Sequence, residues 1–253
     1  MPMPLQAAFW GLLGGSALVL GAACAYLMKL PARAVAAVMA VGSGVLISAV
    51  AFELMDEAFR SGGMIATGGG FLAGAAVYTA ANILVARKGG NHRKRSGSSD
   101  RHRQQDASDG PGTAIAIGAL LDGVPESVVI GASLLTGGHV SVATVAAVFL
   151  SNVPEGLSSA AGMRKAGRSP AYVFGVWGAI ALASGVAALV GNMALGGAAP
   201  SVIAAVTAVA AGAILAMLCD TMIPEAFEVT HEFAGLITVA GFLAAFALSK
   251  LGG

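Results

Sequence analysis

Two apolar segments of the sequence carry the same arrangement of a proline and acidic or amide side chains. The first reads Leu-Asp-Gly-Val-Pro-Glu-Ser at 121–127, and the second reads Leu-Ser-Asn-Val-Pro-Glu-Gly at 150–156. Each motif lies near the middle of a segment long enough to cross a bilayer, where an ionised side chain is costly and usually functional. We therefore expect these two segments to form the walls of a metal-ion pathway.

The spacing within each motif places its oxygen atoms on one helix face. Residues four apart share a face, so Asp122 lies with Glu126 and Ser151 lies with Glu155, while Asn152 is one position round. Each proline also frees the backbone carbonyl one turn earlier. Packed together, the two faces offer three carboxylates, an amide oxygen and a hydroxyl to a divalent cation. A packing role for protonated carboxylates and a proton relay without metal are the alternatives.

Composition favours a polytopic helical membrane protein. The chain is 57% hydrophobic and 11% charged, with 36 glycines and a mean hydropathy of +0.81. At 253 residues we expect one transmembrane domain over 1–253. Cys24 and Cys219 lie inside apolar runs and form no disulfide framework or zinc motif. No ATP-binding motif is present, and we expect no nucleic-acid partner.

Hydropathy divides the chain into eight apolar segments, most of which reach the ~20 residues that a transmembrane helix needs. We expect the first segment to be a retained helix rather than a cleaved signal. The predicted segments are 5–28, 34–59, 63–86, 113–136, 140–163, 170–195, 200–227 and 233–250.

The distribution of basic residues predicts the orientation. If the segments alternate, 12 of the 14 Lys and Arg residues fall in the connections on one side, and only Arg60 and Lys250 fall on the other. This predicts both termini outside and a cytoplasmic loop over 87–112, whose polar, non-periodic composition indicates disorder. His92 and His102 lie in that loop. We interpret it as a basic tether, with weak metal capture as the alternative.

Two segments far apart in the chain align without a gap. Residues 44–59 and 212–227 both end in Glu-Ala-Phe, and their helices would cross the membrane in opposite directions. The match predicts an inverted repeat in a 3+2+3 bundle, with helices 1–3 and 6–8 around central helices 4 and 5. Transporters built from such repeats bind their substrate between them at mid-membrane.

At these residues the chain resembles the ZIP (Zrt/Irt-like) family of metal transporters. Members carry His-Asn-x-Pro-Glu-Gly on helix 4 and a related motif ending in Pro-Glu-Gly on helix 5, which together form a binuclear site for zinc and other divalent metals. The resemblance extends to the segment ending Ile-Pro-Glu-Ala at 223–226. It implies eight helices, outside termini and a variable cytoplasmic loop between helices 3 and 4.

The sequence departs from the family pattern at several ligand positions. Asp122 and Gly123 replace the helix 4 His-Asn, and Ser127 replaces the motif glycine. The carboxylate that many members carry on helix 6 has no counterpart, since Ser184 falls near that place. The resemblance thus implies one site, and the second metal position stays open. The expected ligands of the one implied site are Asp122, Glu126, Asn152 and Glu155, with Ser151 beside them.

The replacement of imidazole by carboxylate makes the predicted site harder. Oxygen ligands suit Mn²⁺, Fe²⁺ or Mg²⁺ relatively better than a nitrogen site does. Zinc is the first choice because the family resemblance favours it, and Mn²⁺, Fe²⁺, Co²⁺ and Cd²⁺ are alternatives.

Other acids suggest a path to and from the site. Glu53 and Glu57 share a face towards the outer end of helix 2, and Asp220 and Glu225 lie on helix 7. We expect Glu53 and Asp220, which are deeper, to serve the pathway, with Glu225 towards the cytoplasmic end as an exit relay. For Glu57 a solvated carboxylate is the favoured alternative.

These observations predict a permease that imports a divalent metal by alternating access. A diverged metal or proton sensor and a carrier of another solute are the alternatives. We do not expect an enzyme, because the Gly-x-Gly-Asp motif of intramembrane aspartyl proteases is absent. The expected partners are the transported metal and the bilayer, with no further cofactor. A homodimer and a bacterial inner membrane are compatible with the sequence.

Overall fold

The computed structural model describes the chain except for residues 29, 88–109, 138–139, 141, 166 and 252–253. The side chains of residues 86, 110–117, 122, 136–137, 143, 165 and 251 are likewise outside the description. His92 and His102, with nearly all of the predicted 87–112 loop, therefore lie outside the described residues.

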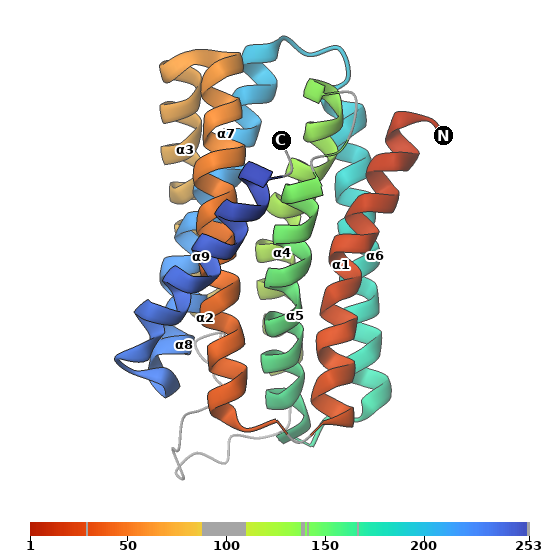
Figure 1. Ribbon diagram of the computed structural model, residues 1–253. Coiled ribbons are helices and arrows are strands. Elements are labelled where there is room, and N and C mark those ends of the chain that lie inside the picture. Colours follow the sequence, from red (N-terminus) through yellow and green to blue (C-terminus); the bar gives the residue numbers. More distant parts are fainter. Residues whose placement is uncertain (29, 88–109, 138–139, 141, 166, 252–253) are drawn as a thin grey trace.

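All regular elements in the described part are helices (Figure 1). Two of them, η1 and η3, are short π-helices, in which hydrogen bonds span five residues. The elements are α1 (Met3–Leu27), α2 (Ala32–Ala49), η1 (Val50–Leu54), α3 (Met55–Arg87), α4 (Gly110–Gly137), α5 (Val142–Lys165), α6 (Pro170–Leu195), α7 (Pro200–Met217), η3 (Leu218–Met222), α8 (Ile223–Thr230) and α9 (Phe233–Leu251).

Length and hydropathy identify six candidate membrane spans among the described residues. One of them, Ala32–Val85, is 54 residues long, and Gly63 interrupts it with a non-helical backbone (φ 69°, ψ −180°). Positive φ is readily adopted only by glycine. The chain therefore turns where the predicted segments 34–59 and 63–86 meet. Helix α5, which carries one of the two motifs, is not among the six candidates.

The ends of the helices follow from local sequence. Helices α6 and α7 begin at Pro170 and Pro200, since proline suits the first helical position. The Ser169 side chain accepts a hydrogen bond from the Tyr172 backbone N–H, which caps α6. Gly167 and Gly197 adopt positive φ in the turns before α6 and α7.

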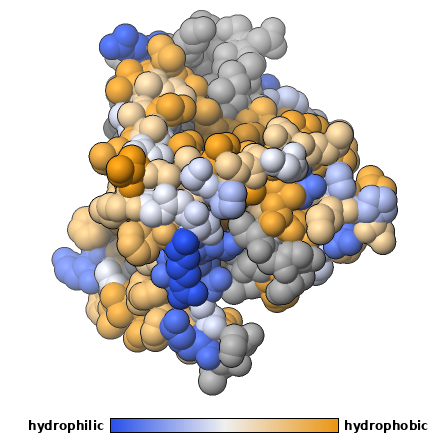
Figure 2. Space-filling view, turned by 90° about the horizontal axis from the view of Figure 1, so that it is seen from above, coloured by the Kyte–Doolittle hydropathy of each residue, from blue (hydrophilic) through white to orange (hydrophobic). Residues whose placement is uncertain are grey.

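The helices pack as two groups. Helix α1 packs along α5 and α6, and α4 packs on α6, while α3 packs along α7 and α2 along α9 (Figure 1). Contacts of α2 with α5 and of α4 with α7 join the groups. Apolar side chains cover much of the end of the bundle seen in Figure 2, with hydrophilic groups at several places on its edge. Ile65 and Leu72 are 92% and 72% exposed, as expected of lipid-facing positions in a multi-pass membrane protein.

Glycines create the closest helix contacts in the group formed by α2, α3, α7 and α9. A Cβ on Gly212 would lie 1.9 Å from the carbonyl oxygen of Phe71, and one on Gly44 would lie 1.9 Å from that of Thr238. Helix α7 thus meets α3 as α2 meets α9, backbone against backbone. Gly44 and Gly212 are the first residues of the two segments that align in the sequence.

The two π-helices fall at corresponding positions in the same alignment. Val50–Leu54 and Leu218–Met222 occupy the same five places of the aligned segments. π-Helices are rare and frequently occur at functional sites. Their agreement, together with the matching glycine contacts, supports an internal repeat.

We predict that Gly74→Ala destabilises the protein. The new Cβ would lie 1.8 Å from the carbonyl oxygen of Val209, so α3 and α7 must separate. We expect a loss of about 2 kcal/mol, or roughly 4 to 8 °C in Tm, measured by thermal unfolding in detergent.

The matched control is Gly69→Ala on the same helix, where an added Cβ meets nothing within 4 Å. This change should leave Tm unchanged or raise it, because alanine favours helix by about 1 kcal/mol. Equal effects of the two substitutions would contradict close packing at Gly74.

Candidate metal centre

Helices α4 and α5 each continue through the proline of their motif. Pro125 and Pro154 are inside the helices, and neither can donate a backbone hydrogen bond to the preceding turn. Pro154 is fully buried, and a Cβ on Gly42 of α2 would lie 3.2 Å from its Cγ. Part of α5 next to the motif therefore packs directly on the other helix group.

The predicted ligands on α4 and α5 are buried. Glu126 is 2% exposed and Glu155 is 5% exposed, while Ser151 and Asn152 are 1% and 3% exposed. Asp122 lies on α4, and its side chain is outside the described ones. Two carboxylates are thus held inside a largely apolar bundle, where a charge is stable only with compensating partners.

Hydrogen bonds orient the two polar residues that precede Glu155. Asn152 Nδ2 donates to the backbone oxygen of Gly14 on α1 over 3.0 Å, and Ser151 Oγ donates to the backbone oxygen of Val148 over 2.9 Å. One N–H of Asn152 and the hydroxyl hydrogen of Ser151 are therefore bound to backbone oxygens. The amide oxygen of Asn152 and the lone pairs of Ser151 stay available as ligand atoms.

Helix α1 contacts both α4 and α5 one turn away from their predicted ligands. A Cβ on Gly14 would lie 3.3 Å from Val148 of α5 and 3.4 Å from Ile130 of α4. Val148 is one turn before Asn152, and Ile130 is one turn after Glu126. Helices α4 and α5 themselves meet only over a short stretch. Helix α1 therefore links α4 and α5 more extensively than direct α4–α5 packing does.

Ser184 of α6 lies beside α4 next to the predicted ligands. A Cβ on Gly123 would lie 3.6 Å from Ser184 Oγ, and one on Gly15 would lie 3.0 Å from the same atom. A hydroxyl of α6 therefore lies close to the backbone of the α4 motif. Ser127, which replaces the motif glycine, donates from Oγ to the Gly123 backbone oxygen over 2.6 Å.

The contact between Ser158 and Glu225 was not predicted from the sequence. Ser158 Oγ donates to Glu225 Oε1, and both side chains are buried. Ser158 is three residues after Glu155, so it shares that face of α5, whereas Glu225 lies on α8. The bond therefore connects the helix that carries Glu155 with the other group. The only sequence signal was the spacing of Ser158 from Glu155.

The other three predicted pathway residues lie elsewhere in the bundle. Glu53 in η1 accepts a hydrogen bond from Ser249 of α9 and is half-buried. Asp220 in η3 is exposed and lies 3.5 Å from the side-chain amide nitrogen of Asn82 on α3. Glu57 is half-buried on α3. Each π-helix thus presents an acid to a neighbouring helix of its own group.

No group of three or more His, Cys, Asp or Glu side chains has metal-binding geometry among the described residues. The predicted site needs Asp122 as its third acid, and that side chain falls outside the description.

No protein-family model and no curated protein compared with the chain matches its sequence.

We predict that Ser158→Ala destabilises the protein, because the buried Glu225 carboxyl loses a hydroxyl donor. A loss of about 1.5 to 3 kcal/mol is expected for a hydrogen bond to a charged group. Thermal unfolding in detergent measures it.

Ser159→Ala is the matched control, since Ser159 is also buried on the next position of α5. We expect a smaller drop in Tm for this variant. If Ser159→Ala is as harmful as Ser158→Ala, the loss reflects packing on α5 and not the bond to Glu225.

Proposed function

We propose that the protein is a ZIP-like permease that imports a divalent metal cation, with zinc as the first candidate. The observation that carries the proposal is the burial of Glu126 and Glu155 on two proline-containing helices of an apolar bundle. Carboxylates in membrane segments are rare and mark ion pathways. Asp122, Asn152 and Ser151 complete the proposed ligand set.

The proposed topology has eight membrane passes in a 3+2+3 arrangement. The turn at Gly63 supports counting Ala32–Val85 as two passes, and the motif of α5 supports including that helix. The matching positions of η1 and η3 support an inverted repeat. The distribution of basic residues supports a proposed orientation with both termini outside, in what we propose to be a bacterial inner membrane.

The proposed mechanism follows from charge compensation. A divalent cation neutralises the acids of α4 and α5, which makes the loaded site compatible with an apolar interior. Glu225 then receives the metal on the cytoplasmic side, next to Ser158, which shares a helix face with Glu155. Alternating access requires the two helix groups to move relative to each other, and the Ser158–Glu225 contact would change in that movement.

We predict that Glu126→Gln combined with Glu155→Gln abolishes saturable metal uptake. The amides keep the shape of the side chains but remove two of the charges that neutralise the cation. Uptake is measured in proteoliposomes loaded with a metal-sensitive dye, with Zn²⁺, Mn²⁺, Fe²⁺, Co²⁺ and Cd²⁺ supplied separately.

Asp56→Asn serves as the control, because Asp56 is exposed and forms a surface ion pair with Arg60. This variant should transport as the wild type does. Absence of flux for every ion, with folded protein reconstituted in both orientations, would overturn the permease and favour a sensor or a carrier of another solute.

The ligand at position 122 should set metal preference. We predict that Asp122→His raises the ratio of Zn²⁺ to Mn²⁺ flux severalfold, because an imidazole nitrogen favours zinc over the harder manganese ion. The same dye assay measures the ratio, and Asp122→Asn is the comparison that removes charge without supplying nitrogen to the metal. An unchanged ratio in Asp122→His would remove Asp122 from the ligand set.

A further inference from the structure

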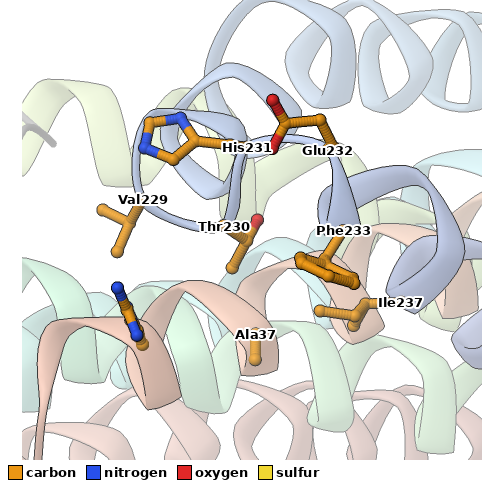
Figure 3. Close-up of a pocket in the computed structure, with 8 residues that line it drawn as sticks. Ala37, Val229, Thr230, His231, Glu232, Phe233 and Ile237 are labelled. Atoms are coloured by element: carbon orange, nitrogen blue, oxygen red, sulfur yellow. The ribbon is translucent and has the colours of Figure 1, made fainter.

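A pocket of about 400 Å³ lies at the end of the bundle where α8 turns into α9 beside the start of α2 (Figure 3). Its volume is in the range of small-ligand sites. Side chains from all three helices line it, and it is separate from the buried acids of α4 and α5. The lining residues are Arg33, Ala37, Val229, Thr230, His231, Glu232, Phe233 and Ile237.

The wall and the rim of this pocket differ in chemistry. Ala37, Val229, Phe233 and Ile237 give it an apolar wall, while His231 and Glu232 lie together on the turn above (Figure 3). The turn is held by an unusual backbone, since His231 has φ 47°. The His231 backbone N–H donates to the Phe227 backbone oxygen over 2.9 Å.

The rim carries two opposite charges that do not neutralise each other. Arg33 and Glu232 are both exposed, and neither forms an ion pair with another residue in the described part of the chain. Both side chains therefore line the pocket without pairing with each other. A ligand with an anionic and a cationic group and an apolar tail matches this arrangement.

The surroundings of the pocket identify a ligand of that kind. Arg33 is the second residue of α2, and Glu232 directly precedes α9, so both charges lie where the chain leaves apolar helices. Phospholipid headgroups occupy that level of a membrane, and basic pockets between transmembrane helices bind them. The apolar wall is open to acyl chains on the same side.

We propose that this pocket binds a phospholipid whose headgroup joins a phosphate to a primary ammonium, as in phosphatidylethanolamine. Arg33 binds the phosphate and Glu232 accepts hydrogen bonds from the ammonium group. The acyl chains lie along Phe233 and Ile237. A phosphatidylglycerol headgroup has the phosphate for Arg33 but no ammonium, so it leaves the charge of Glu232 without a cationic partner, and a choline headgroup has no N–H to donate.

Native mass spectrometry of the delipidated full-length chain tests this assignment. The protein receives phosphatidylethanolamine, phosphatidylglycerol and phosphatidylcholine with identical acyl chains, at equal mole fractions. We expect phosphatidylethanolamine to give the dominant adduct. Arg33→Gln should lower that adduct about fivefold, and Glu232→Gln should lower it to the level of phosphatidylglycerol.

Two further variants separate the pocket from general lipid adhesion. Ala37→Phe fills the apolar wall and should lower phosphatidylethanolamine binding, whereas Arg87→Gln removes an exposed charge that does not line the pocket and should have no effect. Equal adducts of the three lipids, a preference for phosphatidylglycerol, or insensitivity to Arg33→Gln would overturn the proposal. The experiment contains no metal, so its result does not depend on whether the proposed transport is correct.

Discussion

The contact between α1 and α5 fixes the position of the candidate site. A Cβ on Gly21 would lie 2.1 Å from the Val153 backbone oxygen, and one on Gly156 would lie 2.2 Å from that of Leu18. The two backbones therefore touch on either side of Glu155, and no larger residue fits at either glycine. The glycine of the Pro-Glu-Gly motif is thus a steric requirement of packing between α1 and α5.

This packing assigns the buried acids to different helix groups. Glu126 and Glu155 belong to the group of α1, α4, α5 and α6, whereas Glu225 belongs with α2, α3, α7 and α9. Within each group small residues hold backbones together, and Ser158 reaches across the boundary to Glu225. The Ser158–Glu225 bond thus adds a buried polar contact to the α2–α5 and α4–α7 packing that joins the two groups.

Much of the helical framework could be predicted from the sequence. The length of each apolar segment indicates the length of its helix. The turn at Gly63 falls where two predicted segments meet, because glycine is needed for its backbone conformation. Burial of Glu126, Asn152 and Glu155 was also predictable, since their positions within apolar segments give the depth.

The partners of those side chains were not predictable. Asn152 donates to Gly14, and Ser158 to Glu225, across more than sixty residues of sequence. Nothing local in either segment indicates such a pairing, because it depends on how the helices are arranged. The π-helices are also hidden from sequence, since a one-residue change in hydrogen-bond span barely alters the hydropathy pattern. Glu53 and Asp220 were expected to lie deeper than Glu225, yet Glu225 is buried, whereas Glu53 is half-buried and Asp220 is exposed.

The glycine stripe of α1 has a consequence for biosynthesis. Gly11 and Gly15 pack against α6, and Gly21 packs against α5, so their partners are made more than 130 residues later. At 5–20 residues per second, α1 waits on the order of ten seconds in the membrane before they arrive. During that time its small-residue face is open to other helices, including a second nascent α1. Correct assembly of this chain thus depends on the speed of its own synthesis.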